Sequence, residues 1–394
     1  MQPQRMMIWT EGMSEASTRI GTKAAAAIAE ARRITIKIGS SLLIDASGKG
    51  ARHGWLAGVG EDIAALRAQG KQIVLVSSGA VALGRDHLGL KRSARLDYKQ
   101  AAAAAGQALL MQAWERALAP HGIPTAQLLL TIDDTEQRRR SLNARATLEV
   151  LLTQGGLPVV NENDSVATDE LRYGDNDRLS ARVAQLIRSD VLILLSDVDG
   201  LYTADPARDA RATHIDFVPA ITDAIEISAG GASGAGMGSG GMRTKIQAAR
   251  IASGCGCATI IASGHKERPI QRLIEGGIAT FVAATGSPAS AYKTWIAGTL
   301  APGGAVTIDD GALRALESGK SLLPGGVTAV EGRFDRGACL RILDRHGTEV
   351  ARGIAAYTAV EARAICGRGS AHIAERLGYA GPDEIIHRDD LVML

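Results

Sequence analysis

Aromatic side chains are scarce in this chain of 394 residues, of which phenylalanine, tyrosine and tryptophan make up only 3%. Proteins that bind single-stranded nucleic acid stack bases on such rings, so their scarcity argues against that class. Four cysteines are too few for a disulfide scaffold at this length. Cys255 and Cys257 are separated by one residue, and no Cys or His pair follows with zinc-ligand spacing. We therefore expect free thiols, no protein-bound metal and a location in the reducing cytoplasm.

Long apolar runs and strong net charge are also missing. No run reaches the roughly 18 residues that a membrane-spanning helix needs, and a formal net charge of +2 demands no polyanionic partner. Residues 1–32 are expected to form an N-terminal extension with a short helix over 22–33. This segment lacks the leucine-rich core and cleavage site of a secretory signal. Met6, Met7 and Met13 are alternative starts.

Apolar runs rich in β-branched residues alternate with helical patterns over residues 33–286. Hydrophobic residues make up 46% of the chain, enough for a sizeable core. Runs that are apolar throughout are typical of strands buried on both faces of a parallel sheet. The alternation predicts an α/β/α sandwich with a mainly parallel sheet, including helices over 56–69 and 138–154. The expected strands are 34–38, 73–77, 125–130, 157–161, 191–196 and 258–262.

The pattern changes near residue 285. Proline and glycine indicate a linker over 287–302, and 303–394 is expected to form a small, β-rich second domain. Residues 311–394 carry eleven Lys or Arg and eleven Asp or Glu. The basic surface of a nucleic-acid-binding domain is therefore absent at the level of sequence. The expected strands of this domain are 305–308, 327–330, 339–343 and 350–354.

Four segments that combine glycine with polar or charged residues stand at the ends of expected strands: 34–40, 74–80, 161–177 and 239–245. Ligands of open α/β sheets bind at the carboxyl ends of the strands. Lysines and open backbone N–H groups there would allow two anions, such as a carboxylate and a nucleotide phosphate, to meet. At about 4 Å, two such charges repel by roughly 1 kcal/mol in water and roughly 4 kcal/mol in a partly shielded site.

Each segment has a functional and an ordinary structural interpretation. Lys37 lies in an apolar strand, where an ammonium group needs a partner, although an edge strand would leave it on the surface. Ser77-Ser78-Gly79-Ala80 opens a helix whose N–H groups favour an anion, although a serine there is also a common helix cap. The acids of 161–177 can hold an ammonium group, orient a lysine or bind Mg²⁺ through water, or belong to a solvated loop.

The last segment follows a run of Gly, Ala and Ser over 229–242, after which Arg243-Thr244-Lys245 starts a helix. Such a loop can close over phosphates and deliver a lysine; the alternative is a flexible linker, mainly over 229–236. Residues 197–206 are well placed for a nucleotide's base and ribose. A P-loop signature and a G-x-G-x-x-G after the first strand are both absent.

Together these motifs resemble the amino-acid kinase family followed by a PUA domain, over about residues 33–394. The resemblance implies ATP-dependent phosphorylation, with Mg²⁺, of the γ-carboxylate of L-glutamate to L-glutamyl 5-phosphate, the first step of proline synthesis. The kinase motifs are Lys37-x-Gly39, Ser77-Ser78-Gly79-Ala80, Asn161-Glu162-Asn163-Asp164, Gly174-Asp175-Asn176-Asp177, Asp199 to Pro206, and Gly240-Gly241-Met242-x-Thr244-Lys245. The PUA motifs are Ser321 to Pro324, Gly332 to Gly337 and His387 to Asp390.

The resemblance also implies a role for each matching residue. Lys37 and Lys245 would neutralise the transferring phosphoryl group and Asp177 would orient both lysines, so these three are the expected catalytic residues. The expected glutamate-binding residues are Ser78, Gly79, Asp164 and Asn176, with Asp164 at the ammonium group. The expected ATP-binding residues are Lys37, Gly39, Ser196, Asp197, Ser239, Gly240, Gly241, Met242, Arg243, Thr244 and Lys245.

Inhibition by proline and assembly into homodimers or homotetramers are further implications of the resemblance. Three alternatives stay open. A kinase acting on aspartate or acetylglutamate is disfavoured by the PUA-like domain. An RNA-binding protein, since PUA domains commonly meet RNA, is disfavoured by the charge balance. A regulatory protein with an inactive kinase fold is disfavoured by the presence of Lys37, Asp177 and Lys245.

Overall fold

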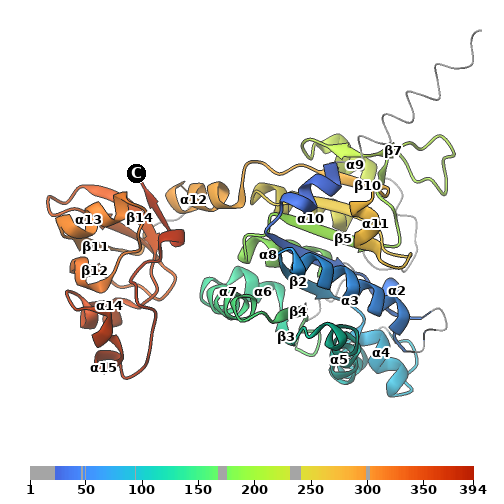
Figure 1. Ribbon diagram of the computed structural model, residues 1–394, viewed down its shortest axis with the longest axis horizontal. Coiled ribbons are helices and arrows are strands. Elements are labelled where there is room, and N and C mark those ends of the chain that lie inside the picture. Colours follow the sequence, from blue (N-terminus) through green and yellow to red (C-terminus); the bar gives the residue numbers. More distant parts are fainter. Residues whose placement is uncertain are drawn as a thin grey trace, which may run out of the picture. The chain divides into compact units, whose positions relative to one another are not determined.

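The chain folds into two compact units, of which the first ends at Pro288 and the second begins at Ala289 (Figure 1). Each unit has its own hydrophobic core. The predicted linker contains helix α12 (Pro288–Gly298). In the described ranges, every helix is too short or too polar to cross a membrane. The computed structural model describes residues 23–45, 48, 50–93, 95–166, 175–230, 241–298 and 302–394.

The first unit is built on an eight-stranded sheet with the order β3-β4-β2-β1-β5-β9-β10-β8. All neighbouring strands are parallel except β9 and β10, so the mainly parallel sheet is confirmed. Six strands lie within one residue of their predicted ends; the short strands β8 and β10 were not predicted. The bounds are β1 (Arg33–Ile38), β2 (Gln72–Ser77), β3 (Thr125–Leu130), β4 (Leu157–Glu162), β5 (Val191–Ser196), β8 (Phe217–Val218), β9 (Ala258–Ser263) and β10 (Ala279–Val282).

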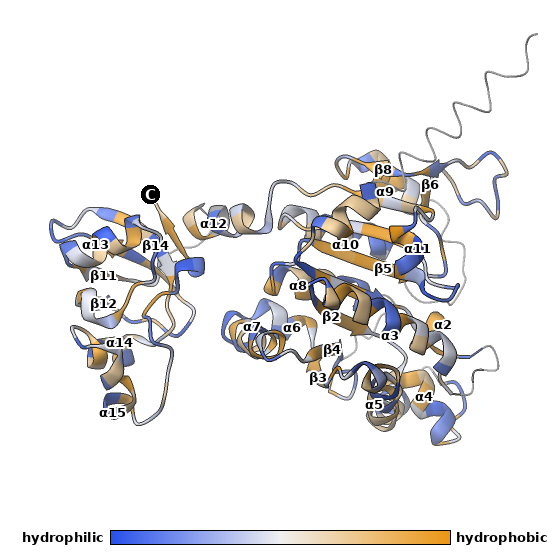
Figure 2. Cartoon of the chain, in the orientation of Figure 1, coloured by the Kyte–Doolittle hydropathy of each residue, from blue (hydrophilic) through white to orange (hydrophobic). Residues whose placement is uncertain are grey.

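Helices cover both faces of this sheet, as an α/β/α sandwich requires (Figure 2). Successive side chains of a strand point to opposite faces. In β2, Ile73 and Leu75 therefore join one core, while Val74 and Val76 join another. The first face packs against α3 (His53–Ala68), α5 (Leu96–Leu118) and α11 (Pro269–Ile274), and the second against α7 (Arg138–Thr153), α8 (Asp175–Leu186) and α10 (Met242–Gly254).

Residues 23–30 form a helix, as predicted within 22–33. Three of the small and aliphatic side chains of this segment, Ala24, Ile28 and Ala31, are buried in the core of the first unit. Lys71, itself buried, donates hydrogen bonds to the carbonyl oxygens of Ala29 (2.6 Å) and Ala31 (2.8 Å), which satisfies acceptors at the helix end. This part of the expected N-terminal extension is therefore integral to the first unit.

Helix α4 (Ala80–His87) crosses α5 at two glycines. A Cβ atom on Gly84 would lie 1.8 Å from the carbonyl oxygen of Ala102, and one on Gly106 would lie 1.8 Å from that of Ala80. The two backbones are thus in direct contact, which only glycine permits. Because α4 starts right after Gly79, the crossing fixes the turn by which β2 leads into the helix.

The second unit is a five-stranded sheet with the order β12-β11-β13-β14-β15. Only β11 and β13 pair in parallel. The four predicted strands are confirmed, and the β-rich character of the domain with them; helices α13, α14 and α15 were not predicted. The bounds are β11 (Gly304–Ile308), α13 (Asp310–Glu317), β12 (Val327–Gly332), β13 (Cys339–Leu343), β14 (Glu349–Ile354), α14 (Ala359–Ile365), α15 (Ile373–Leu377) and β15 (Leu391–Met393).

We expect Gly84→Ala to lower the free energy of unfolding by about 2 kcal/mol, because the added methyl group would overlap the backbone of α5. Urea unfolding followed by circular dichroism measures this. Gly54→Ala is the matched control, since a Cβ atom there meets nothing within 4 Å and alanine favours the helix. Equal unfolding midpoints for wild type and Gly84→Ala would contradict the close crossing.

Candidate active site

The carboxylate of Asp177 joins two lysines that are far apart in sequence. The Nζ atom of Lys37 lies 2.6 Å from its Oδ1, and the Nζ atom of Lys245 lies 3.3 Å from its Oδ2. The hydroxyl of Thr244 donates a hydrogen bond of 2.7 Å to the same Oδ2. Asp177 is fully buried, and both lysines are less than one tenth exposed. The structure thus brings together the three side chains predicted to be catalytic.

The fold explains how these groups meet. In β1, Ile36 and Ile38 face the first core, so the alternation of the strand turns Lys37 toward the face that α8 and α10 cover. Strand β1 lies in the interior of the sheet between β2 and β5, which excludes a surface lysine on an edge strand. Asp177 lies in the first turn of α8 and Lys245 in the first turn of α10.

Burial alone would raise the pKa of the Asp177 carboxyl, but the charges of Lys37 and Lys245 and the hydrogen bonds from Lys37 and Thr244 outweigh it and hold the pKa below its ordinary value. Burial lowers the pKa of the Lys245 ammonium, and the like charge of Lys37 adds to this effect against the attraction of Asp177. Two ammonium groups share one carboxylate, so the cluster has positive charge left to attract an anion.

A polar cluster lies beside Asp177. The side-chain Nδ2 of Asn176 donates to Ser78 Oγ at 2.8 Å and to Asn161 Oδ1 at 3.1 Å. Within the described part of the chain, Asn161 Nδ2 and Asn176 Oδ1 are buried without a hydrogen-bond partner. Buried polar atoms nearly always have a hydrogen-bond partner. This cluster of Ser78, Asn161 and Asn176, called the polar wall below, therefore offers a donor and an acceptor to a polar ligand. Asn161 was missed as a site residue, although its place at the carboxyl end of a strand was a usable signal.

The other predicted residues at this end of the sheet follow β1, β2 and β4. Gly79 precedes α4 as its N-terminal cap and has the left-handed conformation, with a φ of 118°. Gly39 follows β1, and a Cβ atom there would lie 3.7 Å from the Nζ atom of Lys37. Asp164 lies in the turn after β4, two residues beyond Glu162. Loops from three adjacent parallel strands thus lie at the same edge of the sheet as Lys37.

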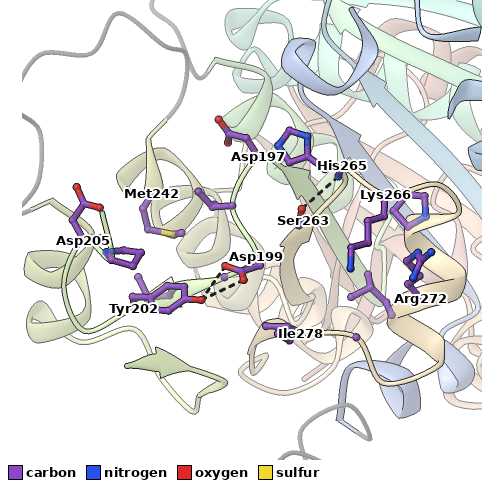
Figure 3. A pocket seen from close by; sticks show the side chains of 18 of the residues that line it. Asp197, Asp199, Tyr202, Asp205, Met242, Ser263, His265, Lys266, Arg272 and Ile278 are labelled. Carbon is purple, nitrogen blue, oxygen red and sulfur yellow. Dashed lines mark hydrogen bonds between the residues drawn. The ribbon is translucent and has the colours of Figure 1, made fainter. Parts of the chain in front are cut away.

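A cavity of about 840 Å³ opens beyond the ends of β5 and β9 (Figure 3), within the size range of small-molecule sites. Of the predicted ATP-binding residues, Asp197 and Met242 line this cavity, and Ser196 donates a hydrogen bond of 2.9 Å to Asp197. Gly241 precedes α10, and Arg243 lies in its first turn. Gly174, Ser239 and Gly240 lie outside the described residues. Sequence reasoning missed the cavity wall after β9, because it left the residues following that strand unexamined.

The protein-family model of the amino acid kinase family matches residues 32–263, and that of the PUA domain matches residues 304–377. The first match covers more than half of the chain, and the chain belongs to the amino acid kinase family. The resemblance of the motifs to this family is thereby confirmed.

Curated relatives that are similar to this chain carry the name of a particular enzyme. Glutamate 5-kinase of Caulobacter vibrioides strain NA1000 / CB15N is 57% identical over 366 residues, which cover 92% of this chain and 97% of that protein. Glutamate 5-kinase 1 of Rhizobium meliloti strain 1021 is 53% identical, covering 94% of each chain. Among solved structures, UMP kinase from Ureaplasma parvum aligns with a TM-score of 0.43 and 16% identity, covering 64% of this chain and 98% of that one.

We expect Asp177→Asn to destabilise the first unit by about 3–5 kcal/mol, because it leaves two buried ammonium groups without their counter-charge. Chemical unfolding at pH 7 measures the difference from wild type. Asp97→Asn, which removes an exposed partner of Arg95, should leave the midpoint unchanged.

The difference in the free energy of unfolding between wild type and Asp177→Asn should depend on pH. The pKa of Asp177 lies below the unfolded value of 3.8 in the folded protein, so its ionisation contributes stability that is fully present above pH 3.8 and is lost as pH falls through the folded pKa. The stability gap between wild type and Asp177→Asn should therefore narrow only below pH 3.8. A gap that closes between pH 7 and pH 5 would contradict the assigned shift.

Proposed function

We propose that this protein transfers the γ-phosphoryl group of ATP to the γ-carboxylate of L-glutamate, giving ADP and L-glutamyl 5-phosphate, the first step of proline synthesis. The observation that carries the proposal is the buried cluster of Lys37, Asp177 and Lys245. An amide-rich polar wall lies beside it, and helix α10, which supplies Lys245, also supplies Met242 to a cavity of nucleotide size. Relatives named glutamate 5-kinase that match nearly the whole chain support glutamate as the acceptor.

The reaction needs no general base, because a glutamate side chain with an ordinary pKa of about 4.3 is already ionised at pH 7. A γ-carboxylate oxygen attacks the γ-phosphorus, the bond from that phosphorus to the bridging oxygen breaks, and ADP leaves with the electron pair. The protein has to place two anions in line and stabilise the charge that spreads over the phosphoryl oxygens. Lys37 and Lys245 would do this, and Asp177 would hold both ammonium groups in position before the substrates arrive.

Glutamate would bind at the polar wall. The amide groups of Asn161 and Asn176 offer a donor and an acceptor that lack partners among the described residues. The hydroxyl of Ser78 and the turn at Gly79 lie beside them. We assign the substrate's ammonium group to Asp164, since it follows the same strand as Asn161 and carries the opposite charge.

ATP would occupy the cavity lined by Asp197 and Met242, with its γ-phosphate directed toward Lys245. Its other proposed contacts are Gly39, Ser196 and residues 239–244. We propose that Mg²⁺ enters bound to the ATP phosphates, as this ion commonly does in kinases. Asp177 is engaged by two lysines, and the described residues contain no group of three or more His, Cys, Asp or Glu able to hold a metal.

Several properties stay proposals on the strength of the resemblance. We assign residues 33–286 to the kinase domain, 287–302 to a connection and 303–394 to the PUA-like domain. Inhibition by L-proline, assembly into homodimers or homotetramers, and a cytoplasmic location belong with them. RNA binding by the second unit has no support from its charge balance.

The decisive test is ATP consumption by the purified protein with Mg²⁺, offering glutamate, aspartate, acetylglutamate and UMP in parallel. Hydroxylamine converts an acyl phosphate into a hydroxamate that can be measured directly. Turnover with glutamate alone supports the proposal. Turnover with a different acceptor refutes the proposal, and so does the absence of turnover with all four acceptors.

We expect Lys245→Ala to lower kcat at least about a hundredfold, because its ammonium group would stabilise charge that develops on the phosphoryl oxygens. The hydroxamate assay at saturating glutamate and ATP measures kcat. Lys320→Ala, which removes an exposed lysine of the second unit, is the control and should behave as wild type. An unchanged kcat in Lys245→Ala would exclude the catalytic role.

We expect Asp164→Ala to raise the KM for glutamate about tenfold or more while the KM for ATP stays within about twofold, because an ion pair to the substrate ammonium contributes at one site only. Initial rates with each substrate varied in turn separate the two constants. Asp164→Asn should lie between wild type and Asp164→Ala. Equal rises in both KM values would point to a general structural defect instead.

A further inference from the structure

The cavity has a second wall that the predicted ATP-binding residues leave out. On one side lie Asp199, Tyr202 and Met242; on the other, the chain from Ser263 to Ile278 follows β9 and passes through α11. Figure 3 shows Lys266 and Arg272 on this second side, with the amino group of Lys266 on the flank that faces Asp199. The first side is acidic, whereas the second carries two cations and one acid, Glu275.

The backbone that carries Lys266 is fixed by α3. The buried indole N–H of Trp55 donates to the carbonyl oxygens of Gly264 at 2.7 Å and Lys266 at 3.2 Å. Asp62, also buried, accepts from the backbone N–H of Ile270 at 2.9 Å and from Arg268 Nε at 3.2 Å. Hydrogen bonds to buried side chains of the neighbouring helix α3 therefore fix the backbone of this segment.

Close packing fixes the start of the same wall. A Cβ atom on Gly264 would lie 2.3 Å from Cδ1 of Leu42, so the chain passes directly against the residues that follow Gly39. The N–H of Gly264 donates to the carbonyl oxygen of Ser196 at 2.8 Å. The wall is therefore tied to two loops that the proposed function already assigns to ATP.

The composition of the cavity matches a nucleoside. Val198 and Ile278 line it and are 38% and 63% exposed; large aliphatic side chains exposed in one pocket are typical of a site that covers a flat apolar ring. Tyr202 donates its hydroxyl proton to the carboxylate of Asp199, which leaves that side acceptor-rich. The opposite side supplies donors through Lys266 and Arg272, because ammonium and guanidinium groups can only donate.

We propose that Lys266 is a nucleotide-binding residue, whose ammonium group donates a hydrogen bond to an acceptor atom of the purine base of the bound nucleoside triphosphate. Trp55 is a positioning residue for this contact, since its indole holds the carbonyl of Lys266 without lining the cavity. The inference rests on the proposed function, in which that nucleotide is the phosphoryl donor.

Calorimetric titration of the full chain with the non-hydrolysable analogue AMP-PNP and Mg²⁺ tests the contact independently of turnover. Lys266→Met keeps the length of the side chain and removes the charge, and should raise the Kd about tenfold, the scale of one charged hydrogen bond. Lys266→Arg should restore most of the affinity. Glu267→Gln alters the exposed neighbour that does not line the cavity and should bind as wild type does.

The role of Trp55 needs a variant that keeps the packing. Trp55→Phe removes the N–H group but leaves an aromatic ring, and should raise the Kd for AMP-PNP severalfold with the KM for glutamate unchanged. A merely structural role would lower the thermal midpoint and leave the Kd of the folded protein at its wild-type value. If this variant does not fold, the Lys266 variants still decide the main proposal.

The outcomes separate this inference from the proposed function. Wild-type affinity in Lys266→Met overturns the inference, as does a wild type that binds no AMP-PNP. If Lys266→Met binds AMP-PNP more weakly than wild type but binds adenosine equally well, Lys266 contacts the phosphates and the proposed base contact is overturned. A wild type that binds AMP-PNP with the expected dependence on Lys266 but does not phosphorylate glutamate refutes the proposed function and leaves the nucleotide contact standing.

Discussion

One carboxylate shared by two buried ammonium groups is the interaction on which this structure depends. Asp177 lies 2.6 Å from one lysine and 3.3 Å from the other, and all three groups are removed from water. Each ammonium group alone would be costly to bury. The sheet and two of the helices on its second face meet this cost together, because β1 supplies one lysine, α10 the other and α8 the acid between them.

The division of polar groups around that cluster suits a reaction between two anions. Toward the ends of β2 and β4, the amides of Asn161 and Asn176 and the hydroxyl of Ser78 can orient a substrate carboxylate without adding repulsion. The turn after β4 adds the acid Asp164, whose charge suits the substrate's ammonium group. Toward β5 and β9 the cavity is lined by acids on one wall and by two cations and an acid on the other. Positive charge is therefore concentrated where the two substrates would touch, and mixed charge lies where a nucleoside needs recognition.

The strands were predictable because a buried parallel strand has to be apolar throughout, as Val191 to Leu195 is, and its ends are set by turn residues. The convergence of Lys37, Asp177 and Lys245 followed from the family's motifs. What escaped prediction depends on contacts between distant segments. The crossing at Gly84 and Gly106 is invisible until two helices are placed side by side. Lys266 lies in a polar loop without a recognisable motif. Its position at the cavity becomes evident from the structure, where the indole of Trp55 donates a hydrogen bond to its carbonyl oxygen.

The helix over residues 23–30 has a consequence for the limits of the folding unit. The match to the amino acid kinase family starts at residue 32, yet Ala24 and Ile28 are part of the core and Lys71 bonds to the backbone at Ala29 and Ala31. A polypeptide trimmed to the edge of the family match would uncover apolar surface beside β1 and leave a buried lysine without acceptors. A shorter product beginning at Met13 would keep residues 23–30, the helix that the structure describes.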